Sequence, residues 1–397
     1  MLTAMCGSCP ATERWALDGT HTVSMKGRDR NKPCWCDSGL KYKKCHLERE
    51  LQERPSIWNA RKDVQGLQRF KTCLHPEAGP SACSGPIVRA HTVRRAADLS
   101  VIARKGHVYQ TSADLGDLHL NKGRLLPKLV GINEASTFFG FCSKHDSATF
   151  APLEATALVP TDEQALLLTY RPLCLELYAK ERQLESLEIA RQGDKGRSLE
   201  EQFGLQEYVL LMRLGMETSL RDLRRHKSRF DADLLARDFA EARYVAVELD
   251  VPPDLMCSGF VQPHYTFDGE RIQDLSDLKT ELQVMSFSLA STAKGGVAVF
   301  AWRSDSDAAS SELVDSLLRL EVVDIPHALV RYATSEFENT YYRPDWWDGL
   351  QQTDKDALVD RLHHGVGPDI ALNPSYLKDD GRRLVRWNVI NVSQKRC

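Results

Sequence analysis

Residues 25–46 read MKGRDRNKPCWCDSGLKYKKCH, and this stretch holds four sulfur or nitrogen side chains close together, those of Cys34, Cys36, Cys45 and His46. Zinc in proteins is bound tetrahedrally by cysteine thiolates and histidine imidazoles. A segment this short cannot build a hydrophobic core, so a metal ion would have to organise it. The spacing Cys-x-Cys-x8-Cys-His therefore predicts a zinc-folded module.

The same stretch resembles the SEC-C motif, a short zinc-binding module best known from the C-terminus of the secretion ATPase SecA. The residues at matching positions are Gly27, Arg28, Asn31, Pro33, Ser38, Gly39, Tyr42, Lys43 and Lys44. Trp35 and Asp37 stand where the motif has its second proline and a glycine, and neither is a ligand. The resemblance implies a module that binds zinc and contacts proteins or ribosomes. It covers about 22 of 397 residues and leaves the function of the remaining chain open.

A second group of cysteine and histidine side chains lies downstream, at Cys73, Cys83, Cys142 and His145. The first two enclose a Pro- and Gly-rich loop, and the last two form a Cys-x-x-His sequence that Asp146 follows. A knuckle, then a β-hairpin, then Cys-x-x-His at a helix start is the order of a treble-clef zinc site. The sequence therefore predicts a second structural zinc ion at this group. The chain is expected to bind one ion if only the first module binds zinc, and two if both groups do.

The residues between these pairs include IVRAHTVRR (87–95), and the whole arrangement resembles the HNH nuclease pattern. That resemblance implies that His91 is a general base, that Asp146 holds Mg²⁺ or another divalent ion, and that Asn133 is the central asparagine. Ala90 departs from the pattern because it stands where a metal ligand is often found. The stretch from His91 to the Cys-x-x-His is also longer than in compact HNH motifs. The alternative is a degenerate treble clef that only stabilises the fold, with His91 hydrogen-bonded in its core.

Composition is that of an ordinary globular protein, with 42% hydrophobic and 27% charged residues and a net charge of -3. Contact with DNA or RNA would then need a local basic patch, and one is offered by Arg221, Arg224, Arg225, His226, Lys227 and Arg229. No apolar run reaches the ~18 residues of a membrane-spanning helix, and no secretory signal is evident, so we expect a cytoplasmic protein without membrane contact. Six of the eleven cysteines lie in the first 75 residues, and their clustering with histidines favours metal binding over disulfides.

Apolar periodicity predicts an α+β protein. Two long helices are expected, over 162–191 and from Ser198 to about residue 229, where Ser198 and Glu201 have the spacing of a capping box. A polar helix is expected over 47–70. Strands are expected at 244–251, 257–267, 284–290, 295–302 and 384–392, forming a mostly antiparallel sheet, with helices at 310–320, 325–340 and 354–362.

The chain is accordingly interpreted as five successive units. These are a disordered lead or upstream start extension (1–24), the small SEC-C zinc module (25–50), an HNH-like zinc unit (51–155), a helical hairpin (156–240) and an α+β domain of unknown function (241–397).

Two functions follow from these units. The first is a zinc-binding protein with an HNH-like metal-dependent endonuclease core, active in defence or DNA processing. The alternative is a non-catalytic, zinc-stabilised adaptor that binds protein or nucleic acid. A protein partner would be engaged through the SEC-C module, whereas the nuclease would take DNA or RNA.

Overall fold

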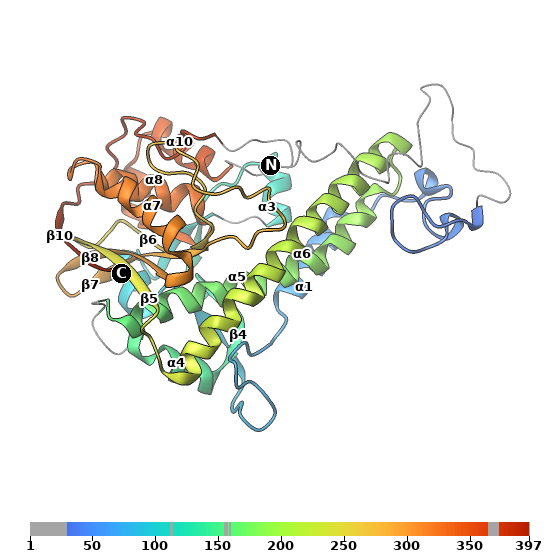
Figure 1. Ribbon diagram of the computed structural model, residues 1–397. Helices are drawn as coiled ribbons and strands as arrows, with labels where there is room; N and C mark the ends of the chain where they lie inside the picture. The colour runs from blue at the N-terminus through green and yellow to red at the C-terminus, as the bar shows by residue number, and fades with distance from the viewer. Residues whose placement is uncertain (1–29, 112–113, 155–157, 159, 364–372, 397) are drawn as a thin grey trace.

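The computed structural model describes residues 30–111, 114–154, 158, 160–363 and 373–396. The lead expected at residues 1–24 lies outside this part of the chain. The protein has a body built around a large β-sheet, and a long pair of helices projects from it (Figure 1). Residues 30–51 sit at the far end of these helices, remote from the sheet (Figure 1).

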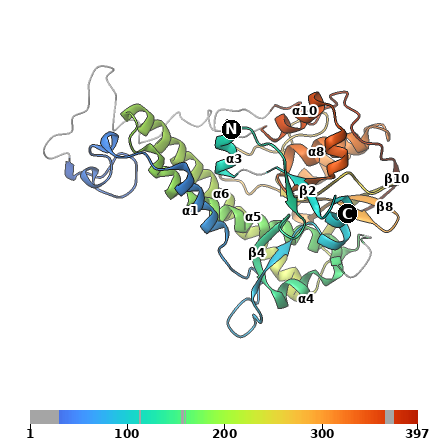
Figure 2. The ribbon, with the colours of Figure 1, turned by 180° about the vertical axis from the view of Figure 1, so that it is seen from behind.

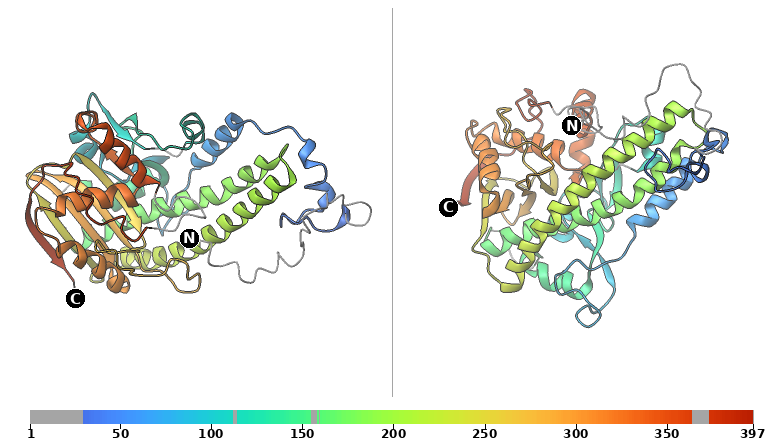
Figure 3. Two further views of the ribbon diagram at one scale, coloured as in Figure 1. Left: turned by 90° about the horizontal axis from the view of Figure 1, so that it is seen from above. Right: turned by 45° about the vertical axis from the view of Figure 1, so that its right-hand side comes forward.

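The projecting pair consists of α5 (Asp162–Arg191) and α6 (Leu199–Ala236), joined through the turn η6 (Gln192–Asp194). Ser198 and Glu201 begin α6 with the capping box that their spacing predicts. The helices run side by side out of the body toward the N-terminal module (Figure 3). α1 (Ile57–Gln68) lies along α5, as the view from behind shows (Figure 2).

The sheet has eight strands, and every pair of neighbours is antiparallel. In spatial order they are β10 (Val389–Lys395), β5 (Ala242–Leu249), β8 (Gly295–Arg303), β7 (Met285–Thr292), β6 (Leu255–Val261), β9 (Thr340–Tyr342), β2 (His107–Gln110) and β3 (Lys128–Gly131). The mostly antiparallel α+β class is therefore confirmed. β5 to β8 lie close to the first four expected strands, but the last strand begins at Val389, later than expected.

Both faces of this sheet are covered, which explains its almost continuous apolar strands. In β8, the side chains of Ala298, Phe300 and Trp302 face one core, and those of Val297 and Val299 face the other. The first core is closed by α7 (Asp307–Leu318), α8 (Ile325–Glu336) and α10 (Gln352–Leu362), with α9 (Pro344–Gly349) beside it. The second is closed by the N-terminal half of α5 together with α6.

A second, two-stranded sheet pairs β1 (Ile87–His91) with β4 (Thr137–Cys142), and α4 (Ser143–Glu154) follows directly. The residues between β1 and β4 contain η5 (Arg95–Leu99), α2 (Ser100–Ile102), β2, α3 (Leu115–Leu120) and β3. β2 and β3 join the large sheet because Tyr109 pairs with Tyr342 of β9. The large sheet thus crosses the boundary expected at residue 155.

The helix expected over 47–70 is wrong in its first half. The chain instead forms a short 3₁₀ turn, η4 (Arg49–Leu51), then extends, and α1 begins only at Ile57. Pro55 explains the interruption, because a proline disfavours helical backbone at the residue before it. Among the described residues, none of the helices combines the length and apolar character needed to cross a bilayer.

Candidate metal centres

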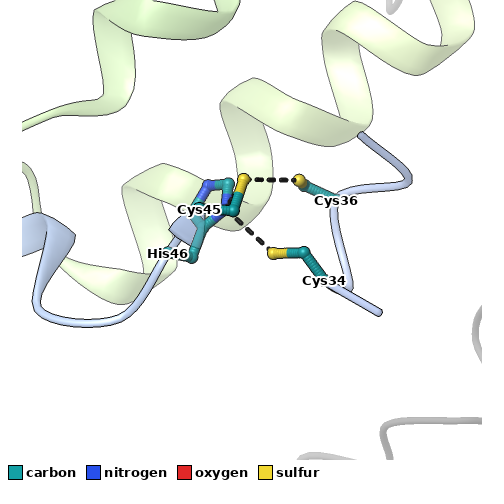
Figure 4. A group of neighbouring side chains, drawn as sticks. All are labelled: Cys34, Cys36, Cys45 and His46. Atoms are coloured by element: carbon teal, nitrogen blue, oxygen red, sulfur yellow. Dashed lines mark hydrogen bonds between the residues drawn. The ribbon is translucent and has the colours of Figure 1, made fainter. Parts of the chain in front are cut away.

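The first cluster brings together the side chains predicted to bind zinc in the N-terminal module. The ligand atoms of Cys34, Cys36, Cys45 and His46 all lie within 4.8 Å of one another, and the four side chains point toward a common centre (Figure 4). His46 Nδ1 is 3.2 Å from the Sγ atoms of Cys34 and Cys45, and the Sγ atoms of Cys36 and Cys45 are 3.5 Å apart.

These separations match the edges of a zinc tetrahedron. With Zn–S and Zn–N bonds of about 2.3 and 2.0 Å, two ligand sulfurs lie about 3.8 Å apart and a sulfur and a nitrogen about 3.5 Å apart. A disulfide would instead bring two sulfurs to about 2.05 Å. None of the eight cysteines in the described residues is disulfide-bonded. The cluster therefore fits a zinc ion bound through a Cys₃His set.

The local backbone of the module explains how so short a segment presents four ligands. The amide of Cys34 donates to the carbonyl of Leu40 at 2.7 Å, which closes a tight loop around Cys36. Asp37 adopts a left-handed conformation in this loop, with φ +59°, which aspartate tolerates better than most residues. The departure from the motif's glycine is therefore compatible with its backbone. Trp35, the other departure, packs its ring on those of His46 and of Phe203 in α6, with centroids 4.3 and 3.9 Å apart.

The thiols of this cluster interact strongly. A hydrogen bond from Cys34, followed by one from Cys45, lowers the pKa of the Cys36 thiol well below its usual range. The hydrogen bond with Cys36 is also the main reason that the pKa of Cys34 is raised. The cluster thus favours a thiolate at Cys36, and the thiolate is the form that binds metal.

The second cluster draws its ligands from three segments. Cys73 and Cys83 flank the predicted loop, Cys142 ends β4, and His145 lies in the first turn of α4. The Nδ1 atom of His145 is 3.3, 3.7 and 3.4 Å from the Sγ atoms of Cys73, Cys83 and Cys142, respectively. These distances again fit the roughly 3.5 Å sulfur–nitrogen edge of a zinc tetrahedron. The pairing of β1 with β4 is what brings the loop against the start of α4.

Neighbouring residues pack closely around the second cluster. The ring of His75 stacks on that of His145, with centroids 4.1 Å apart. Gly85 has φ +77°, and a Cβ there would lie 2.2 Å from the Ser143 hydroxyl, so the loop approaches the helix start closely. His75, Glu77 and His145 form a further group of ligand atoms within 4.8 Å, but it shares His145 with the Cys₃His set.

In the part of the chain that the structure describes, neither His91 nor Asp146 belongs to a group of three or more His, Cys, Asp or Glu side chains close enough to hold a metal ion. The side-chain carbonyl of Asn133 accepts a hydrogen bond of 2.8 Å from Arg95 at the surface. Ala90 is fully buried and offers no ligand. Asp146 is partly buried, and burial raises the pKa of its carboxyl.

His91 ends β1, with its Nε2 atom 3.2 Å from the carbonyl oxygen of Ile132. Because a carbonyl oxygen only accepts, Nε2 carries the proton and Nδ1 keeps its lone pair. Burial lowers the pKa of His91, so the ring is neutral near pH 7. This geometry is compatible with a base but equally with the hydrogen-bonded core histidine of the alternative interpretation.

The positive charge of the basic run on α6 is offset in part by acidic side chains of the same chain. Its members pair with acidic side chains or a carbonyl of the same chain: Arg221 with Asp222, Arg224 with Glu181, Arg225 and Arg229 with Glu281, Lys227 with Asp231, and His226 with the Leu282 carbonyl. The predicted nucleic-acid contact on this helix is therefore weakened.

Sequence reasoning missed the residues around the first cluster that come from the hairpin. Asp194, in η6, is fully buried and lies 2.8 Å from His46. Arg191 at the end of α5 and Gln206 in α6 also reach this region. No local signal points to them, because they lie well over a hundred residues beyond the motif.

Comparison with known families gives one local match. The SEC-C motif matches residues 30–48, the stretch that carries the first cluster. No curated protein and no solved structure matches the chain. The match supports zinc binding by the N-terminal module and extends to no other part of the molecule.

Proposed function

We propose that this protein is a non-catalytic, zinc-stabilised adaptor that carries two structural zinc ions. The observation that carries the proposal is that each cluster offers three cysteines and one histidine. Four protein ligands complete a tetrahedral zinc ion and leave no position for a water or substrate, whereas catalytic zinc sites keep one position open. Both ions would thus stabilise the fold and take no part in catalysis.

The partner is a protein in this proposal. The cations of α6 are engaged within the chain, and the net charge is -3, so nucleic acid is disfavoured. The N-terminal module, in contrast, stands at the end of a long hairpin and exposes Leu40, Lys41, Lys43 and Lys44. An acidic protein surface would complement these side chains. Because thiolate ligands need a reducing environment, we assign the protein to the cytoplasm.

Zinc content tests the proposal directly. Full-length protein purified under reducing conditions should contain two zinc ions per chain by elemental analysis. Cys34→Ser should retain one ion, whereas Cys257→Ala, which removes a buried thiol outside both clusters, should retain two. A wild-type protein with fewer than two tightly held ions would contradict the proposal.

An HNH-like endonuclease is the second candidate. It rests on the order β1, β4, α4 beside a Cys₃His cluster. In that case His91 would accept the proton of the attacking water and Asp146 would hold Mg²⁺ or another divalent ion. Plasmid nicking with Mg²⁺, Mn²⁺ or Ni²⁺ decides between the two.

If the protein is a nuclease, the rate of plasmid cleavage should fall at least about 100-fold in His91→Ala. The control variant His107→Ala, which changes an exposed histidine, should cleave at the wild-type rate. If the folded wild-type protein shows no metal-dependent cleavage, the nuclease is excluded and the adaptor remains as the proposed function.

A further inference from the structure

We propose that the tip of the helical hairpin is a built docking site for the first zinc centre. In this arrangement Asp194 positions the ligand His46, and zinc occupancy holds residues 30–54 on the tip. The inference rests on zinc binding by the Cys34, Cys36, Cys45 and His46 cluster, as proposed above.

The first support is the hydrogen bonding of Asp194. Its carboxylate is fully buried and accepts from His46 Nε2 at 2.8 Å and from Arg49 Nε at 2.5 Å, both in the N-terminal module. Gln206 of α6 donates a third hydrogen bond at 2.6 Å. A carboxylate only accepts, so Nε2 of His46 carries a proton, and Nδ1, which faces the thiol cluster, is the nitrogen left to bind the metal. This carboxylate–histidine–metal order orients a ligand and raises its basicity.

The second support is the charge around the cluster. Zinc with three thiolates and a neutral imidazole carries one net negative charge, and Asp194 adds another. Arg191 donates from Nη2 to the carbonyl of Cys36 at 2.7 Å and to its Sγ at 3.4 Å, while Arg49 binds Asp194. The two guanidinium groups offset these negative charges, which lowers the cost of burying the loaded centre on the tip.

The third support is the close fit of the backbones. The amide of Gly196 donates to the carbonyl of Arg49 at 3.0 Å, and the Arg54 guanidinium donates to the carbonyl of Gly196 at 3.0 Å. Gly196 has φ +67°, and a Cβ there would lie 2.6 Å from the carbonyl oxygen of Gln52. Glycine is therefore required by both its conformation and the approaching chain.

The module has too small a core to dock without its metal. Its buried apolar cluster consists of Cys34, Cys36 and Tyr42, so two of its three members are themselves ligands. Metal binding and folding are then one event in this segment. Loss of zinc should release residues 30–54 and expose Asp194 and the Phe203 ring that Trp35 covers.

The test uses full-length protein and compares Asp194→Ala with Glu200→Gln, which alters an exposed carboxylate in the first turn of α6. Zinc affinity is measured by competition with a chromophoric chelator, and hydrogen exchange is followed by mass spectrometry. We expect Asp194→Ala to weaken one of the two ions about 10- to 100-fold and to speed exchange in residues 30–54. Glu200→Gln should change neither. Retention of the other ion would show that the body remains folded.

A spectroscopic measurement separates positioning of His46 from packing. Cobalt substituted into the first centre should give a changed ligand-field spectrum in Asp194→Asn, which preserves the size of the side chain but not its charge. A wild-type protein that binds no zinc would contradict the proposed function. Two ions in the wild type, with unchanged affinity, exchange and cobalt spectrum in the Asp194 variants, would instead overturn this inference alone.

Discussion

The imidazole of His46 and the carboxylate of Asp194 lie 2.8 Å apart, although 148 residues separate them in the chain, and both side chains are almost completely buried. This pair ties the N-terminal module to the far end of the helical hairpin. Its placement means that the module is part of the fold and not an independent tail.

Gly196 offers a way to disturb this attachment without touching a metal ligand. Gly196→Ala should destabilise the docked module by about 1–3 kcal/mol, because alanine is strained at positive φ and its Cβ would meet the Gln52 carbonyl. Hydrogen exchange of residues 30–54 would report the loss. Gly193→Ala is the matched control, since a Cβ there meets nothing within 4 Å. Equal hydrogen-exchange rates of residues 30–54 in the two variants would argue against a close approach of Gly196 to the Gln52 carbonyl.

At the second centre, the assignment of His145 over His75 as the ligand can be tested. Cys142→Ser and His145→Ala should each lower the zinc content by one ion and reduce thermal stability, because the loop at residues 73–83 is then no longer fixed to α4. His75→Ala removes only a stacked ring and should keep both ions. Loss of zinc in His75→Ala with retention in His145→Ala would reverse the assignment.

A buried ion pair joins the residues after β1 to the large sheet. Arg94 and Asp98 bind each other, and both also bind the backbone of Ser291 in β7 at 2.8 Å. Asp98→Ala should cost about 3–5 kcal/mol, because it leaves a buried guanidinium unpaired. Urea unfolding measures this value. The double variant Arg94→Met/Asp98→Leu should recover much of the loss, and a double variant less stable than the single one would contradict this account.

Glu336 should make the stability of the body depend on pH. Burial raises the pKa of its carboxyl to about 7, although the hydrogen bond from Tyr376 opposes the shift. In the unfolded chain the pKa is about 4.3, so the folded state binds the proton more tightly. Its contribution is then fully present below about pH 4 and is lost as the pH rises through about 7.

Denaturant unfolding from pH 4 to 8 would measure how the free energy of unfolding falls as the pH rises. Glu336→Gln should make this pH dependence smaller. Glu338→Gln, at an exposed neighbouring carboxylate, should leave it unchanged. An identical slope in wild type and Glu336→Gln would exclude Glu336 as the source.

Local patterns in the sequence were sufficient for several parts of this structure. Cys34, Cys36, Cys45 and His46 converge as their spacing predicts, because a loop of a few residues is enough to bring them together. Ser198 and Glu201 mark the start of α6, since a capping box involves only neighbouring backbone. The strands β5 to β8 were recognisable by their apolar residues. These features depend on contacts that are short in sequence.

Other features depend on contacts between distant segments, which no local pattern in the sequence predicts. β9 has three residues, yet it carries β2 and β3 into the large sheet through Tyr342 and so crosses an expected unit boundary. Some acidic partners of the basic run on α6, namely Glu181 and Glu281, lie far from it in the sequence. Asp194 carries no motif and meets His46 only because two long helices return the chain to the N-terminal module. By itself, then, the sequence determined the two groups of candidate ligands and most of the elements, whose interactions are local. Only the tertiary structure decided what surrounds and orients those ligands, because burial and long-range hydrogen bonds arise only when the helices and strands are packed.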